Sequence, residues 1–104
     1  MEKKFTKVGK VSHFINILRK ELPILKEQYK INYLGVFGSF VLKEQSEDSD
    51  LDILVNFEET PSLFRFVNLE QHLSKLLEIK VDLVMKDSLK PNIGKHILRE
   101  VVKI

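Results

Sequence analysis

The sequence has no cysteine, few glycines and prolines, and no long hydrophobic run. The absence of cysteine excludes disulfides, thiol catalysis and cysteine-based zinc sites. No apolar run approaches the ~20 residues that a membrane span needs, and no secretory signal follows Met1. We therefore expect a cytoplasmic protein with no membrane partner. The 17 basic and 15 acidic residues leave a formal charge of +2, which makes nucleic acid an unexpected partner.

The length and composition predict one small domain. The chain has 104 residues, of which 43% are hydrophobic, and this suits a single core. Residues 1–10 carry four lysines without periodicity, and we expect a basic N-terminal arm there. Residues 11–104 form the predicted domain. The third strand is followed by only one expected helix, so we expect no second domain.

Hydrophobic periodicity predicts alternating helices and strands. The expected elements are helix 11–29, strand 33–37, a turn or two of helix after Ser39, strand 51–57, a helix from Thr60-Pro61 to about Glu78, strand 79–85, and a helix opened by Pro91. Pro23 predicts either a kink or two collinear helices. The last helix is expected to turn Ile93, Ile97, Leu98 and Val101 inward. The fold class is therefore α/β (α+β), with a small mixed sheet of three or slightly more strands covered by helices.

Two aspartates stand at the start of the second strand. Alternation sends Asp50 and Asp52 to one face, with their Cα atoms ~6.6 Å apart. Two charges at that distance repel by roughly 2.5 kcal/mol at an effective dielectric of ~20. A purely structural strand has no reason to accept that repulsion, so the pair indicates a functional site. An acidic turn before a strand is the simpler alternative.

A third aspartate, Asp82, interrupts the apolar strand 79–85. An ionised carboxylate in such a strand is costly unless it is paired or bound to metal. Lys80 shares its face and is one candidate partner. If the third strand lies beside the second, Asp82 instead joins Asp50 and Asp52. Three carboxylates without histidine or cysteine favour Mg²⁺ or Mn²⁺.

Gly38-Ser39 ends the first strand and supplies a second part of the predicted site. Glycine there permits close backbone approach, and amides at a following helix start can hold phosphate oxygens. The first two strands must run antiparallel for Gly38 to meet Asp52.

Gly38-Ser39, ten residues and then Asp50-Leu51-Asp52 resemble the signature of the DNA polymerase β-like nucleotidyltransferase superfamily. Val81-Asp82-Leu83-Val84 resembles the strand of its third carboxylate. The order and lengths of the elements are similar to those of the minimal nucleotidyltransferases (MNT), including antitoxins paired with HEPN-domain toxins. The resemblance covers about residues 11–103.

This resemblance implies metal-dependent transfer of a nucleoside monophosphate, AMP from ATP, to a hydroxyl of a partner protein. Asp50, Asp52 and Asp82 would be the catalytic and metal-binding residues, with Mg²⁺ or Mn²⁺ as cofactor. Gly38, Ser39 and Lys43 would bind the nucleotide. A HEPN-domain toxin would be the partner, and the chain would be its antitoxin. A homo-oligomer is also compatible with the sequence.

Related sequences often carry Ala-Arg-Gly where this chain has Val41-Leu42-Lys43. The missing arginine motivates an alternative, an antitoxin or regulatory subunit that acts by binding its partner without catalysis. A third reading is a small nucleotidyltransferase acting on an antibiotic or on RNA. A calcium loop from Asp48 to Glu59 is disfavoured because Ile53 stands where that loop needs glycine. His13, His72 and His96 are scattered and are expected to be ordinary surface residues.

Overall fold

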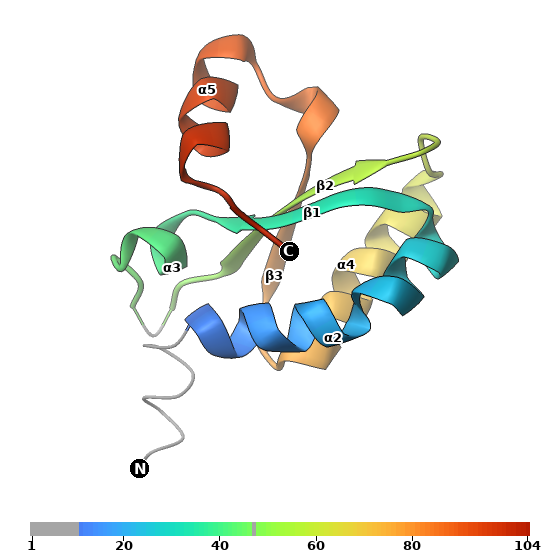
Figure 1. The fold of residues 1–104 in the computed structure, drawn as a ribbon, viewed down its shortest axis with the longest axis horizontal. Helices are drawn as coiled ribbons and strands as arrows, with labels where there is room; N and C mark the ends of the chain where they lie inside the picture. The colour runs from blue at the N-terminus through green and yellow to red at the C-terminus, as the bar shows by residue number, and fades with distance from the viewer. Residues whose placement is uncertain (1–10, 47) are drawn as a thin grey trace.

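The computed structural model describes residues 11–46 and 48–104, so the predicted basic arm at residues 1–10 lies outside the described residues. A four-stranded mixed sheet lies between two sets of helices (Figure 1). Helices α2 (Val11–Tyr29) and α4 (Leu63–Leu77) cover one side of the sheet, and α5 (Pro91–Glu100) stands on the other. Within the described ranges, no helix is long and apolar enough to cross a membrane.

Helix α2 is continuous and passes through Pro23. Its buried residues Phe14, Leu18 and Leu25 form one stripe at helical spacing, and they pack in the core beneath the sheet. Pro23 lies on the exposed side, so the backbone hydrogen bond that proline removes is lost toward solvent. Burial of the apolar stripe therefore holds one helix where the sequence also allowed two.

The strands are β1 (Ile31–Phe37), β2 (Leu51–Phe57), β3 (Val81–Met85) and β4 (Val102–Lys103), arranged in the order β3-β2-β1-β4. Strands β1 and β2 are antiparallel, as expected, and β2 and β3 are parallel. Periodicity predicted three of these strands. The fourth, the short β4, pairs antiparallel with β1. Two residues carry too little periodicity to be recognised as a strand, so only the packing against β1 reveals it.

Helix α4 begins later than predicted. Ser62, not Thr60, is its N-cap, and the Ser62 hydroxyl accepts a hydrogen bond from the Arg65 amide at 3.2 Å. Pro61 precedes the helix and is not in its first turn. The predicted start at Thr60-Pro61 was wrong because both Thr60 and Ser62 can cap a helix, and only the local geometry decides between them.

The predicted inward face of α5 was wrong for two of its four residues. Pro91 opens the helix as expected, but Ile93 and Leu98 are 55% and 46% exposed. Gly94 is the buried residue of α5, and a Cβ built there would lie 3.4 Å from Leu89 Cβ. The helix thus packs closely through a small residue, and Ile93 and Leu98 remain open to solvent.

The two faces of the sheet differ in chemistry. Leu51, Ile53 and Val55 of β2 belong to the core shared with α2 and α4. The alternate residues Asp52, Leu54 and Asn56 point to the opposite face, because strand side chains alternate. The structure therefore confirms the alternation predicted for β2 and places Asp52 on the face away from the main core.

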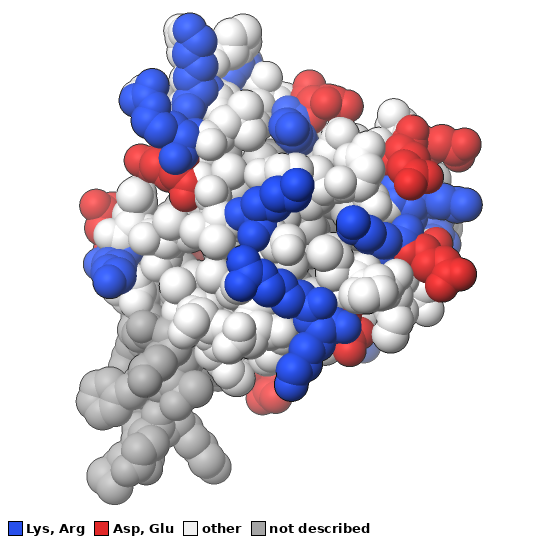
Figure 2. Space-filling model, viewed as in Figure 1, with Lys and Arg blue, Asp and Glu red and all other residues white. Residues whose placement is uncertain are grey.

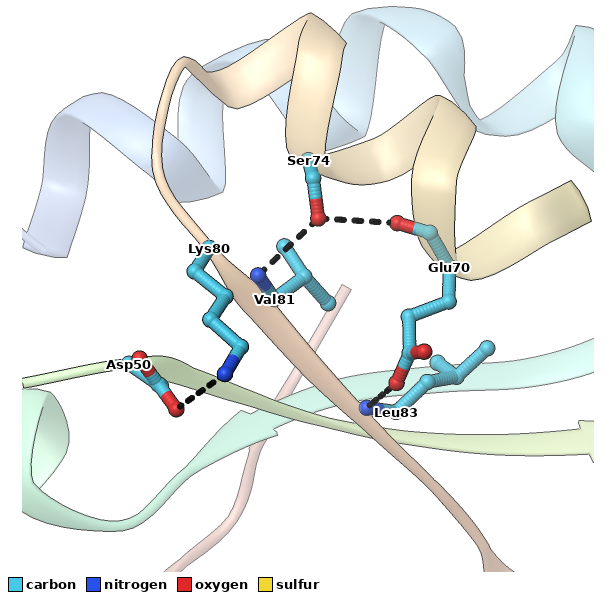
Figure 3. Close-up of polar contacts among 6 residues, drawn as sticks. All are labelled: Asp50, Glu70, Ser74, Lys80, Val81 and Leu83. Atoms are coloured by element: carbon cyan, nitrogen blue, oxygen red, sulfur yellow. Dashed lines mark hydrogen bonds and ion pairs between the residues drawn. The ribbon is translucent and has the colours of Figure 1, made fainter. Parts of the chain in front are cut away.

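The outer edge of β3 is covered by side chains of α4 (Figure 3). The Glu70 carboxylate accepts a hydrogen bond from the Leu83 amide at 2.9 Å, and the Ser74 hydroxyl accepts one from the Val81 amide at 3.0 Å. Edge amides left open would invite pairing with another chain. Glu70 and Ser74 lie one helical turn apart, so they reach alternate amides of the same strand.

We expect Glu70→Ala to lower the free energy of unfolding by about 1 kcal/mol, because the half-buried Leu83 amide loses its acceptor. Denaturant unfolding measures the change. Gln71→Ala is the control, since Gln71 is an exposed neighbour on the same helix. Equal stability of the two variants would contradict the role given to the Glu70 carboxylate.

Candidate active site

A tight turn joins β1 to the short helix α3 (Ser39–Leu42). Gly38 has φ 84°, a conformation that other residues rarely adopt. Its carbonyl oxygen accepts hydrogen bonds from the amides of Val41 and Leu42, both at 3.0 Å. The single helical turn after Ser39 is thus confirmed, and glycine is required for the backbone to enter it.

Gly38 also leaves room for the Asp52 carboxylate. A Cβ built at Gly38 would lie 2.0 Å from Asp52 Oδ2 and 2.9 Å from Asp52 Cγ. No side chain fits between them. The turn and the carboxylate, fourteen positions apart in sequence, are therefore in direct contact, as the antiparallel pairing of Phe37 with Asp52 requires.

Strand register brings two of the predicted aspartates side by side. Asp52 on β2 is the register partner of Asp82 on β3. Neighbouring strands lie about 4.8 Å apart, so the two side chains leave the same face as neighbours. Asp50 lies in the connection just before β2. We call Asp50, Asp52 and Asp82 the acidic cluster.

The acidic cluster changes the ionisation of its central member. Burial, and then the negative charges of Asp82 and Asp50, raise the pKa of Asp52 from 3.8 to about 6. Each contribution disfavours the charged form. A divalent cation would offset this repulsion, and a set of oxygen donors alone suits Mg²⁺ or Mn²⁺. The residue types of the cluster therefore fit such a metal.

Lys80 pairs with Asp50 and not with Asp82. Its Nζ lies 3.9 Å from Asp50 Oδ2, and both side chains are substantially exposed (Figure 3). The alternative that paired Lys80 with a buried Asp82 was wrong, because Asp82 is exposed. Across residues 11–46 and 48–104, no three His, Cys, Asp or Glu side chains are gathered closely enough to hold a metal ion. The cluster is thus a set of interacting neighbours, and its convergence on one cation stays a prediction.

The remaining predicted positions lie at the surface. Lys43 ends α3 in a left-handed conformation with φ 60°, and its side chain is exposed. His13, His72 and His96 are all exposed. Residues 51–57 form β2, which excludes the loop that the calcium-site alternative needed.

Sequence patterns missed a basic group on the same face as Asp52. Lys86 Nζ lies 4.5 Å from the ring centre of Tyr33, and Lys103 Nζ lies 5.9 Å from it. These residues come from three separate segments, so no local motif could have joined them. The one signal in the sequence was the alternation along β1, which places Tyr33 and Phe37 on the same face of the sheet.

Carboxylates on two adjacent strands beside a glycine-serine turn match the arrangement expected of a nucleotidyltransferase site. The family described as "Polymerase beta, Nucleotidyltransferase" matches residues 20–104. The protein adenylyltransferase MntA of Thermococcus cleftensis is 53% identical over 89 residues, which cover 86% of this chain and 90% of that protein. The chain therefore belongs to the polymerase β nucleotidyltransferase family, and the predicted resemblance is confirmed.

Solved structures agree with this assignment. A structure described as a proposed minimal nucleotidyltransferase has a TM-score of 0.75 at 34% identity and covers 88% of this chain and 94% of its own. A toxin-antitoxin structure with AMP-PNP has a TM-score of 0.64 at 27% identity, covering 86% of this chain and 67% of its own. A structure of a tri-AMPylated HEPN toxin with its MNT antitoxin, from Shewanella oneidensis, shares the fold at a TM-score of 0.57 and 24% identity. The match covers 88% of this chain and 66% of that chain. The predicted α+β nucleotidyltransferase fold is thus confirmed.

Proposed function

We propose that this chain transfers AMP from ATP to a hydroxyl of a partner protein, and that the partner is a HEPN-domain toxin. The register pairing of Asp52 with Asp82 beside Gly38 is the observation that carries this proposal. The name of the relative from Thermococcus cleftensis and the AMP-PNP in a related structure support adenylate as the transferred group. The chain would then neutralise the toxin by modifying it.

Asp50, Asp52 and Asp82 would hold Mg²⁺, or Mn²⁺, which when bound neutralises phosphate charge and lowers the pKa of the acceptor hydroxyl. Gly38 and Ser39 position the β- and γ-phosphates, since the bare Gly38 backbone allows close approach. Lys43 supplies positive charge beside that turn, in place of the arginine of related sequences. Exposed Asp82 is open to an incoming acceptor and takes its proton.

The transfer is a displacement at the α-phosphorus of ATP. The acceptor oxygen forms a bond to the α-phosphorus. The bond between the α-phosphorus and the oxygen that bridges it to the β-phosphorus breaks, and pyrophosphate leaves with that electron pair. The proton of the acceptor hydroxyl goes to the carboxylate of Asp82. The protein's contribution is thus positioning and charge, not a covalent intermediate.

A transfer assay with ATP labelled at the α-phosphate, Mg²⁺ and a co-expressed HEPN-domain protein tests the proposal. We expect label in the HEPN protein and loss of toxicity with substoichiometric amounts of this chain. The Asp50→Asn, Asp52→Asn double variant should transfer nothing. If that variant still neutralises its partner at equal dose, the non-catalytic binding alternative is correct. Absence of labelling by the wild-type chain would refute adenylate transfer to this acceptor.

A further inference from the structure

We propose that Tyr33, Lys86 and Lys103 form an acceptor subsite that binds an acidic side chain of the protein receiving the adenylate. This inference rests on the proposed transfer function and adds a rule for choosing the acceptor. The three residues are called the basic subsite below. None of them belongs to the acidic cluster or to the Gly38-Ser39 turn.

The backbone around Gly35 shapes the basic subsite. A Cβ built at Gly35 would lie 3.3 Å from both Tyr33 Cε1 and Tyr33 Oη, and 2.5 Å from Val101 Cγ2. The Tyr33 ring therefore leans along β1 over a position that has no side chain. Lys86, from the 3₁₀ helix η1 (Lys86–Ser88) that follows β3, reaches across to place its ammonium over this ring.

The charge of the basic subsite is not neutralised within the described part of the chain. Among residues 11–46 and 48–104, neither the Lys86 nor the Lys103 ammonium has a carboxylate within 4.0 Å. The ion pair formed in these ranges is Lys80–Asp50. In Figure 2, basic side chains lie across the middle of the view, where the C-terminal segment crosses the sheet in Figure 1, and acidic ones lie mostly toward the rim. Two ammonium groups without a carboxylate partner, both beside one ring, attract an anion to this position.

The Tyr33 hydroxyl completes the donor set. Burial raises the pKa of Tyr33 above 10.0, so its hydroxyl remains protonated at neutral pH and can donate a hydrogen bond. An anion at this position would meet two ammonium groups and one hydroxyl donor. A carboxylate has two acceptor oxygens and matches this arrangement.

Strand register places the basic subsite on the face of the acidic cluster. Tyr33 and Phe37 alternate onto the same face of β1, and Phe37 is the register partner of Asp52. Lys103 is the register partner of Gly35, which lies between them. Four residues along a strand span about 13 Å, and an extended acceptor segment covers that distance in about four residues. The recognised acidic residue should therefore stand about four positions from the modified hydroxyl.

A nucleotide base is the competing occupant, but the geometry disfavours it. The Tyr33 ring leans toward Gly35, and Lys86 lies over the ring, which leaves little aromatic surface for a purine to stack upon. The phosphates are also expected at Gly38-Ser39, on the far side of the Phe37–Asp52 pair from Tyr33. An acceptor side chain therefore suits the basic subsite better than the adenine does.

Binding of hexaglutamate, followed through backbone amide ¹⁵N shifts of the full chain, tests the subsite without any transfer. We expect shifts at Tyr33, Lys86 and Lys103, and affinity at least about tenfold weaker in the Lys86→Gln, Lys103→Gln variant. Arginine at both positions should preserve binding. The matched control is Lys20→Gln, Lys26→Gln, which removes two exposed charges from α2 on the other side of the sheet.

Two results would overturn the subsite. One is equal weakening of hexaglutamate binding in both glutamine variants, which would show that binding depends on the net charge of the chain and not on these lysines. The other is a set of shifts produced at these three residues by ATP and Mg²⁺ but not by hexaglutamate, which would assign the position to the nucleotide.

Kinetics then separate the subsite from the proposed function. In the transfer assay, the Lys86→Gln, Lys103→Gln variant should raise KM for the HEPN protein at least about tenfold while KM for ATP stays within about twofold. An unchanged KM for the protein would refute the subsite even if transfer is confirmed. Asp52→Asn should abolish transfer but leave hexaglutamate binding intact. If the wild type binds hexaglutamate at the basic subsite but transfers no adenylate, the transfer function is refuted and the subsite is not.

Discussion

Asp52→Asn is expected to lower adenylate transfer by at least about a hundredfold, because it removes a charged oxygen donor at the centre of the acidic cluster. Asp52 contacts the Gly38 turn and is the register partner of Asp82, so it lies between the two parts of the candidate site. Initial rates with labelled ATP and the HEPN protein measure the effect. The control is Asp87→Asn, since Asp87 is an exposed carboxylate of η1 outside the cluster. Rates within about twofold of wild type for Asp52→Asn would contradict the assigned role.

The same variant should be more stable than the wild type at neutral pH. The pKa of Asp52 is about 6 in the folded chain and 3.8 as an ordinary carboxyl, so between these values the folded state binds more protons than the unfolded state. The free energy of unfolding should therefore fall as pH rises from about 4 to about 6, and then level off. Asparagine removes this dependence. Partial exposure screens the carboxylate, which leaves an expected gain of about 1 kcal/mol at pH 7.

Denaturant unfolding of both proteins at pH 4 and pH 7, without divalent cations, measures this difference. Adding Mg²⁺ at pH 7 should stabilise the wild type more than Asp52→Asn, because a ligand stabilises the state that binds it. A variant less stable than the wild type at pH 7 would show that Asp52 is not held under electrostatic strain.

Gly38→Ala should also reduce transfer by at least about a hundredfold. A methyl group at this position would lie 2.0 Å from Asp52 Oδ2, so the carboxylate has to move away from the turn. The backbone φ of 84° adds a conformational cost of about 1–2 kcal/mol for any residue with a Cβ. We therefore expect loss of both stability and activity, measured by thermal unfolding and by the transfer assay.

Gly94→Ala is the matched control for this substitution. A Cβ at Gly94 would meet Leu89 at 3.4 and 3.9 Å, which is ordinary contact, and alanine favours the helix by up to about 1 kcal/mol. The control should keep wild-type transfer and unfold at the same or a higher temperature. Equal behaviour of the two alanine variants would show that the Gly38–Asp52 contact does not matter for function.

Local sequence patterns predicted most of the helices and strands, but not which of their apolar faces are buried. The apolar stripe of α2 was sufficient to place Phe14, Leu18 and Leu25 in the core, because helical spacing alone decides which residues share a face. The same reasoning failed for α5, where Ile93 and Leu98 are exposed. Periodicity shows that a helix has an apolar face but not whether another element covers it.

The candidate site was predictable in its residues and not in its contacts. The spacing of Gly38, Asp50 and Asp52 indicated the site, since each residue type has a separate chemical reason to be there. The partner of Lys80 could not be predicted, because Asp50 and Asp82 were both within reach and only the fold places the ammonium near Asp50. The basic subsite could not be predicted at all, since its members come from β1, η1 and β4.

By itself, the sequence determined the family and the α+β class and indicated the candidate acidic residues, because these depend on residue types and short spacings. The tertiary structure alone decided that Asp82 adjoins Asp52, that Asp52 meets the bare Gly38 backbone, and that two lysines gather around Tyr33. Each of these contacts joins segments on different strands or turns. Strand order and register bring them together, and those follow from how the whole core packs.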